Sequence, residues 1–218
     1  GTTLTGFGLF FVGLSFLKDT FSGLENSIPF EAISQTSYGL ALFVLAGFIL
    51  TVLIQSSGAA MAITLSLAAS GAIPLATAGA LVIGANLGSG LLAMLNNSAA
   101  NAAARRVALG SLLFKLVGSL IILPFVHLLA ETMGKLSLPK AELVIYFHVF
   151  YNLVRCLVML PFVDPMARFC KTIIRDEPEL DTQLRPKHLD VSALDTPTLA
   201  LANAARETLR IGLTIDGY

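Results

Sequence analysis

Two groups of uncharged polar residues lie in a stretch, Ala32 to Ala104, that contains no Asp, Glu, Lys, Arg or His. The first group is Gln55-Ser56-Ser57-Gly58, and the second is Gly84-Ala85-Asn86-Leu87-Gly88-Ser89-Gly90. The residues around both groups are apolar and typical of a lipid bilayer, where an unpaired polar group costs several kcal/mol. We therefore expect the two groups to form a binding site for ions or a small polar solute.

The residue types indicate which solutes such a site could hold. Gln55 carries an amide, and Ser56 and Ser57 carry hydroxyls; these oxygens suit Na⁺. The free N–H groups of a helix N-terminus suit an oxyanion such as phosphate. Gly58 is expected to let the chain turn.

The second group adds polar atoms and backbone freedom. Gly84 and Gly88 are expected to permit unwinding of the segment 75–95, while Asn86 and Ser89 supply an amide and a hydroxyl. The alternative is that these polar side chains bond back to their own helix and that the glycines allow close helix packing.

A third set of polar residues shares one face of a later apolar segment, 141–163. His148, Asn152 and Arg155 fall at positions i, i+4 and i+7. They could contact phosphate or couple its movement, but we favour an interhelical polar bond, or Arg155 reaching toward the interface. Lys115 is expected to extend toward the cytoplasmic side of the membrane.

Composition places the chain among integral membrane proteins. Of its 218 residues 13% are charged and 55% hydrophobic, and its mean hydropathy is +0.79, whereas soluble domains carry about 25% charged residues. Lys+Arg and Asp+Glu both number 14, which gives no support for nucleic-acid binding. No catalytic triad, carboxylate pair or metal-ligand spacing is present, so we expect neither an enzyme nor a metal centre.

Charge distribution predicts the topology. Arg105, Arg106, Arg168, Lys171 and Arg175 would share the cytoplasmic side, with the acidic loop 19–31 outside. The intervening chain must then cross an odd number of times. A hairpin with the Gln-Ser-Ser-Gly group at its tip, plus a broken segment 75–95, satisfies this; a single long helix through 38–70 followed by a re-entrant loop also does.

The prediction is thus an all-α, polytopic helical membrane protein with a re-entrant or broken-helix hairpin and a short cytoplasmic helical tail. Its membrane transport domain covers 1–163, a cytoplasmic linker covers 164–196, and a helical segment begins at 197 and runs to 218. Asp195-Thr196-Pro197 is typical of a helix start.

The order of these motifs resembles the type II sodium/phosphate cotransporter family. Thr51 to Ser57 is similar to the family's QSSS motif, Gly84 to Gly88 to its GANIGTT-like motif, Arg105 to Leu109 to its basic loop, and Phe147 to Leu153 to its FHTLFN-like segment. Pro186 to Leu209 resembles the join to the PhoU-like helices of bacterial members.

The resemblance implies sodium-coupled phosphate transport by alternating access, in a fold of two inverted repeats whose hairpins meet at the substrate site. This chain would supply the second repeat, with Na⁺ held near Gln55, Ser56 and Ser57, and would need a first-repeat half or a second copy of itself. It would lie in the plasma or inner membrane. The chain departs from the pattern at Gly58, Ser89-Gly90 and Lys115. The hydroxyls missing at the first two sites leave open a non-transporting anchoring or regulatory module. A passive anion pore is a third alternative, which would keep the polar groups and need no sodium.

Overall fold

The structure is a computed structural model that describes residues 1–22, 28–36, 38–175, 186, 189 and 191–216. Within these residues every regular element is a helix, as predicted. They divide into one unit from Gly1 to Arg175 and another from Asp176 to Tyr218. The second unit contains η4 (Val191–Asp195) and α11 (Pro197–Asp216), so the helix expected after Pro197 is present. Parts of the predicted linker and of the Pro186–Leu209 resemblance lie outside the described residues.

The first unit is a bundle of helices joined by short connections. In chain order the elements are α1 (Thr2–Phe21), α2 (Phe30–Ser34), α3 (Gly39–Ile54), α4 (Ser57–Ala69), α5 (Leu75–Asn96), α6 (Ala102–Ile122), η2 (Leu123–Phe125), α7 (Val126–Gly134), α8 (Lys140–Met159), η3 (Leu160–Phe162) and α9 (Val163–Ile173). Helix α9 covers the first residues of the predicted linker.

Proline shapes the two longest helical segments in the same way. Each contains a Leu-Pro-Phe sequence, with Pro124 in η2 and Pro161 in η3. Proline lacks an N–H group and cannot take its place in a regular α-helical ladder, so a short 3₁₀ turn replaces one α turn. Helices α6 and α7, and likewise α8 and α9, therefore continue one another through a bend.

Four segments of the described chain are long and apolar enough to cross a membrane: Thr2–Phe21, Leu75–Asn96, Ala102–Gly134 and Lys140–Ile173. Helices α3 and α4, with 16 and 13 residues, are about 24 and 20 Å long. A bilayer core is about 30 Å thick, so neither helix crosses it alone. Together they form the predicted hairpin, and the alternative of one long helix through 38–70 is wrong.

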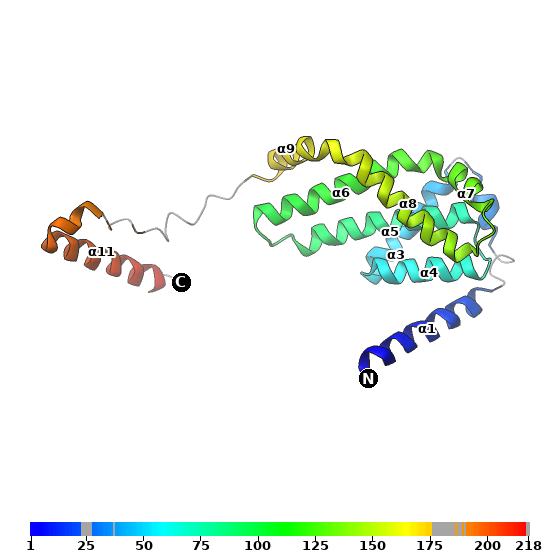
Figure 1. Cartoon of the computed structure of the whole chain (residues 1–218), viewed down its shortest axis with the longest axis horizontal. Helices are drawn as coiled ribbons and strands as arrows, with labels where there is room; N and C mark the ends of the chain where they lie inside the picture. The colour runs from blue at the N-terminus through cyan, green and yellow to red at the C-terminus, as the bar shows by residue number, and fades with distance from the viewer. Residues whose placement is uncertain (23–27, 37, 176–185, 187–188, 190, 217–218) are drawn as a thin grey trace. The chain divides into compact units, whose positions relative to one another are not determined.

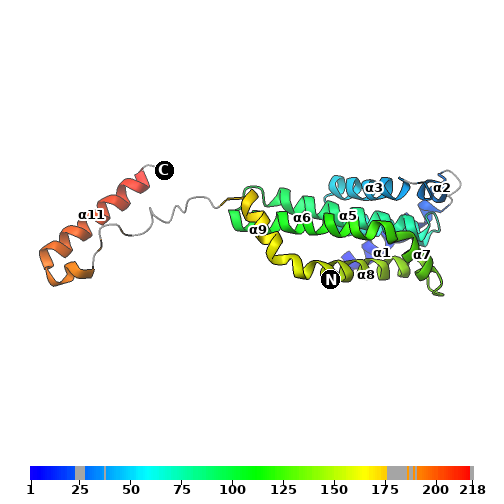
Figure 2. The same ribbon diagram turned by 90° about the horizontal axis from the view of Figure 1, so that it is seen from above.

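Helix α5 is the centre of the bundle. It packs against α3, α4, α6, α7 and α8, and Figure 2 shows α3 on one side of it and α8 on the other. Val82 and Ile83 of α5 are fully buried beside Phe147 and Tyr151 of α8. The hairpin of α3 and α4 runs along only part of α5, so its tip lies part-way along the bundle (Figure 1).

The two ends of the bundle are held by polar contacts between distant segments. At one end His127 Nε2 of α7 lies 3.2 Å from the Ser34 carbonyl oxygen of α2. At the other, Arg106 Nε of α6 donates to the Ile174 carbonyl oxygen at 2.9 Å, just after α9. Arg106 and the basic α9 therefore share one end, as the charge pattern predicted.

Candidate functional site

The tip of the α3–α4 hairpin is a turn of two residues. Helix α3 ends at Ile54, and Gln55 adopts a left-handed conformation with φ 57° and ψ 25°. It is the one non-glycine residue with positive φ in the described chain. Ser56 is extended, and its hydroxyl accepts a hydrogen bond from the Ala59 N–H at 3.2 Å, which caps the start of α4.

Gly58 does not make the turn, contrary to the sequence prediction. It lies in the first turn of α4, one residue beyond Ser57. A Cβ at this position would have Ser56 Oγ as its nearest neighbour, at 3.8 Å, so there is space for a side chain. The change of chain direction comes from Gln55 and the cap from Ser56.

The second polar group does not interrupt its helix. Helix α5 runs unbroken from Leu75 to Asn96, so the expected unwinding at Gly84 and Gly88 is wrong. A Cβ on Gly84 would collide with the Val44 carbonyl oxygen of α3, and one on Gly88 would lie 2.7 Å from Thr51 Cβ. These glycines are required for close approach of α3 and α5, the alternative that the sequence left open.

A cavity of about 270 Å³ brings the predicted polar groups together. Ser57 and Gly58 contribute from α4, Asn86 from α5 and His148 from α8; Met61, Val82, Ala85 and Ile145 complete the lining. Each of the three motif groups thus supplies at least one residue. Gln55 and Ser56 belong to the adjoining turn and do not line the cavity.

The lining atoms suit a small polar solute. The first turn of α4 presents N–H groups that have no partner within their own helix, together with the Ser57 hydroxyl. Asn86 adds an amide, whose Nδ2 also donates to the Val82 carbonyl oxygen of its own helix at 3.3 Å, and His148 adds ring nitrogens that can donate or accept. One water takes about 30 Å³ in the liquid, so the cavity has room for a hydrated ion or an oxyanion. No carboxylate is among the lining residues.

Ser89 connects this region to a charge that the sequence analysis did not assign to the site. Its hydroxyl donates to the Asn86 carbonyl oxygen at 2.7 Å and accepts from Lys115 Nζ of α6 at 2.8 Å. Lys115 thus points at α5, whereas we expected it to extend toward the cytoplasmic surface. The sequence feature that could have indicated this role is a single lysine near the middle of a predicted span.

The polar face of α8 is also present as predicted. Asn152 Nδ2 donates to the His148 carbonyl oxygen at 2.8 Å, and Arg155 Nη2 donates to Asn152 Oδ1 at 2.8 Å. The Arg155 guanidinium lies 5.7 Å from the Tyr151 ring centroid. Among the described residues the hydrogen bonds of this face run along α8, so the interhelical polar bond, one of the two favoured alternatives, is not present.

Two hydroxyls of the buried core have no hydrogen-bond partner among the described residues: Thr51 Oγ1 and Thr77 Oγ1. Thr51 is one helical turn before Gln55 on α3. Buried polar atoms are nearly always paired with protein, water or an ion. Thr51 Oγ1 is therefore an oxygen that could serve a bound cation close to the hairpin tip.

Residues 9–138 match the sequence model of a known family, described as Na⁺/Pi-cotransporter. The match covers more than half of the chain, including both polar groups and Lys115. The chain belongs to the Na⁺/Pi-cotransporter family. This is a family of transporters and not of enzymes, and together with the spanning helices it makes the chain an integral membrane protein.

Relatives of this family member have been named in several bacteria. The chain is 73% identical over 208 residues to the Escherichia coli K12 protein named "Putative inorganic phosphate export protein YjbB", an alignment that covers 95% of the chain and 38% of that relative. The Salmonella typhimurium protein of the same name is 64% identical over the same shares. An uncharacterized Bacillus subtilis protein, YqeW, is 27% identical over 80% of the chain and 57% of its own length. No solved structure matches.

Proposed function

We propose that this chain forms part of a sodium-coupled transporter that moves inorganic phosphate across the membrane by alternating access. The observation that carries the proposal is the cavity where Ser57 and Gly58, at the hairpin tip, meet Asn86 and His148. It lies part-way along the bundle, where an alternating-access transporter needs its site. Family membership and the names of the relatives support phosphate as the solute.

Phosphate and sodium would share the Ser57 hydroxyl and otherwise use different groups of this site. Phosphate oxygens would accept hydrogen bonds from the N-terminal N–H groups of α4 and from the Ser57 hydroxyl. Na⁺ would take the oxygens of Gln55, Ser56 and Ser57, with Thr51 Oγ1 as a further neutral oxygen donor. A bound sodium ion beside the phosphate would offset part of its negative charge, which couples their binding.

The proposal requires a second half. The chain spans only 38% of the length of the enterobacterial relatives, and Gln55 and Ser57 are exposed in it. A first-repeat half, or a second copy of this chain, would cover the hairpin tip and complete the site. We further propose a plasma- or inner-membrane location with α11 on the cytoplasmic side, as the start of a PhoU-like element for regulation or assembly.

A second candidate is sodium-independent phosphate efflux. The relatives are named for phosphate export, whereas an inward sodium gradient favours uptake. The position of Lys115 favours this candidate. Its ammonium group donates to Ser89, which places a positive charge of the protein one helical turn from Asn86. Such a charge could attract phosphate without a sodium ion.

Flux measurements in proteoliposomes distinguish these functions. Full-length protein would be reconstituted, and uptake and efflux of labelled phosphate measured with sodium or potassium as the only cation. Sodium coupling predicts flux that needs sodium and reverses with the sodium gradient. Flux of equal size in potassium would support the second candidate or a pore. Absence of flux from well-folded protein would refute both and leave an anchoring or regulatory module.

A further inference from the structure

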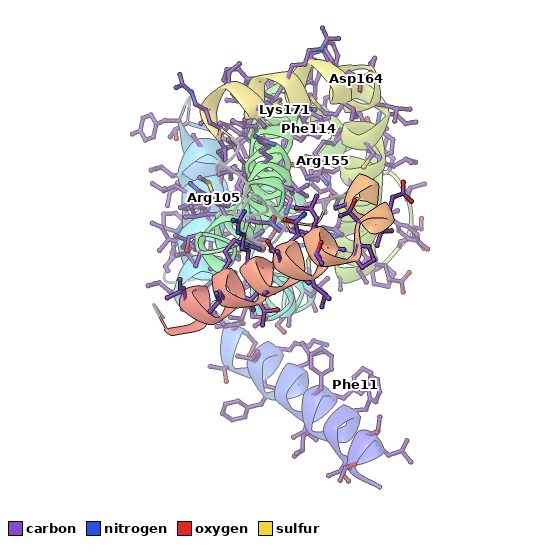
Figure 3. All side chains as sticks on the ribbon, turned by 90° about the vertical axis from the view of Figure 1, so that its left-hand side faces the viewer. Phe11, Arg105, Phe114, Arg155, Asp164 and Lys171 are labelled. Atoms are coloured by element: carbon purple, nitrogen blue, oxygen red, sulfur yellow. The ribbon has the colours of Figure 1, made fainter. Side chains whose placement is uncertain are left out.

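A second cavity, of about 570 Å³, lies between α6, α8 and α9. None of its lining residues also lines the cavity at the hairpin tip. Figure 3 looks at the bundle from the side of α9 and shows Phe114, Arg155 and Lys171 near one another, and all three line this cavity. The walls are mostly apolar, and four of the lining residues are lysines or arginines.

The charged residues that line this cavity are all positive. Arg106, Lys115, Arg155 and Lys171 line the cavity, and no carboxylate does. Lys115 and Arg155 lie within candidate membrane spans. In the described chain each donates to a neutral oxygen, Lys115 to Ser89 Oγ and Arg155 to Asn152 Oδ1. Charged side chains within membrane spans face the bundle interior or a water-filled cavity, and they are a signal for a substrate or ion pathway.

The side chains are also held in place. A Cβ on Gly118 would lie 2.5 Å from Arg155 Cγ, so the absence of a side chain on α6 makes room for the arginine stem. Gly118 is three residues beyond Lys115, on the same face of α6. The Arg155 stem is therefore held against α6, while the Lys115 ammonium is held on α5 by Ser89. An anion bound by both cations would offset the repulsion between their like charges.

Hydrogen bonds connect these cations with the residues of the hairpin cavity. Lys115 reaches Asn86 through Ser89. Arg155 reaches His148 through Asn152. Asn86 and His148 line the hairpin cavity, and Lys115 and Arg155 line the larger one. Two short chains of hydrogen bonds thus link residues that line one cavity with residues that line the other.

We propose that Lys115 and Arg155 form a second oxyanion station, on the route by which phosphate passes between the hairpin cavity and the basic end of the bundle. The ligand is a phosphate-type oxyanion, held by ammonium and guanidinium donors without a coordinating sodium ion. This inference rests on the proposed function for its choice of solute. The shared chemistry would also fit the phosphate of an anionic lipid headgroup, and we commit to free phosphate.

Equilibrium binding tests the station separately from transport. Labelled phosphate would be titrated onto the full-length protein in detergent, once in sodium-free potassium buffer and once with sodium. We expect binding in sodium-free buffer that weakens at least ten-fold in Lys115→Met and in Arg155→Met. Lys115→Arg keeps the charge and should retain this binding. Lys135→Met removes a cation outside both cavity linings and serves as the matched control.

Two further measurements check that the variants fold and whether the bound phosphate group comes from free phosphate or from a lipid. Size-exclusion profile and Tm would be measured for every variant, and Lys115→Arg supplies a charge-retaining comparison if Lys115→Met is unstable. Phosphatidylglycerol and phosphatidylcholine would be added in place of phosphate. A Lys115-dependent rise in Tm with phosphatidylglycerol, without one from inorganic phosphate, would overturn the free-phosphate station and point to a lipid headgroup.

Different results would overturn the oxyanion station and the proposed transport function. Sodium-free binding that is unchanged by both charge-removing variants would overturn the station, while sodium-dependent binding lost in Ser57→Ala would still support the hairpin site. Sodium-free binding that depends on Lys115, with no sodium-dependent component and no flux, would support the station as a binding site and contradict the proposed transport.

Discussion

Lys115 Nζ donates a hydrogen bond to Ser89 Oγ across the contact between α6 and α5, over a distance of 2.8 Å. Ser89 in turn donates to the Asn86 carbonyl oxygen, so the charge lies next to a residue of the candidate site. The pair joins two spans and places a fixed positive charge in a region whose neighbours on α5 are uncharged.

The Lys115–Ser89 bond predicts non-additive effects on stability. Ser89→Ala removes the acceptor and leaves an ammonium without that partner, so we expect a loss of about 1–3 kcal/mol in the free energy of unfolding. Lys115→Met combined with Ser89→Ala should cost less than the sum of the two single changes. Unfolding in mixed micelles measures this coupling. Ser98→Ala, in the exposed connection after α5, is the control, and strict additivity would contradict the bond.

The left-handed Gln55 predicts different results for two small replacements. A non-glycine residue in this conformation carries strain of about 1–3 kcal/mol. Gln55→Gly should therefore keep or raise the Tm, whereas Gln55→Ala should not raise it. Both remove the amide and, on our proposal, weaken sodium-dependent phosphate flux. Full flux in Gln55→Gly would show that the residue serves the turn alone.

The glycine contact between α3 and α5 predicts a large effect from one methyl group. Gly84→Ala places a Cβ against the Val44 carbonyl oxygen, and overpacking of this kind costs about 1–3 kcal/mol. We expect a lower Tm and less folded protein. Gly13→Ala on α1 is the matched control, since a Cβ there meets no atom within 4 Å, and its Tm should stay or rise. Equal stability of the two variants would contradict the packing role.

How far the sequence predicted these features depends on which physical property each one reflects. The hairpin was one of two arrangements that the sequence predicted, because Gln55-Ser56-Ser57 interrupts the apolar run from 38 to 70. The residue that turns the chain was not, since glycine is the usual candidate for positive φ and Gly58 stands nearby. The structure identifies Gln55 as the turning residue by its positive φ, next to the Ser56 cap on α4.

The glycines of α5 were ambiguous for a different reason. Unwinding and close packing both call for small residues, and only the position of α3 opposite Gly84 and Gly88 decides between them. Lys115 could be recognised as a lone charge in a span, yet its partner Ser89 depends on how α6 is rotated against α5. His148 was placed on a polar face by spacing alone, and the fold added that it faces Asn86 across a cavity.

Replacement of Asn86 by aspartate tests whether transported phosphate passes through the hairpin cavity. Asn86→Asp keeps the shape of the side chain and puts a negative charge into the hairpin cavity, where it would repel phosphate by several kcal/mol at close range. Asn96→Asp makes the same change at the end of α5, outside the cavity. In proteoliposomes with a sodium gradient, we expect phosphate flux to be at least ten-fold lower for Asn86→Asp and near normal for Asn96→Asp. Equal phosphate flux in the two folded variants would contradict this route.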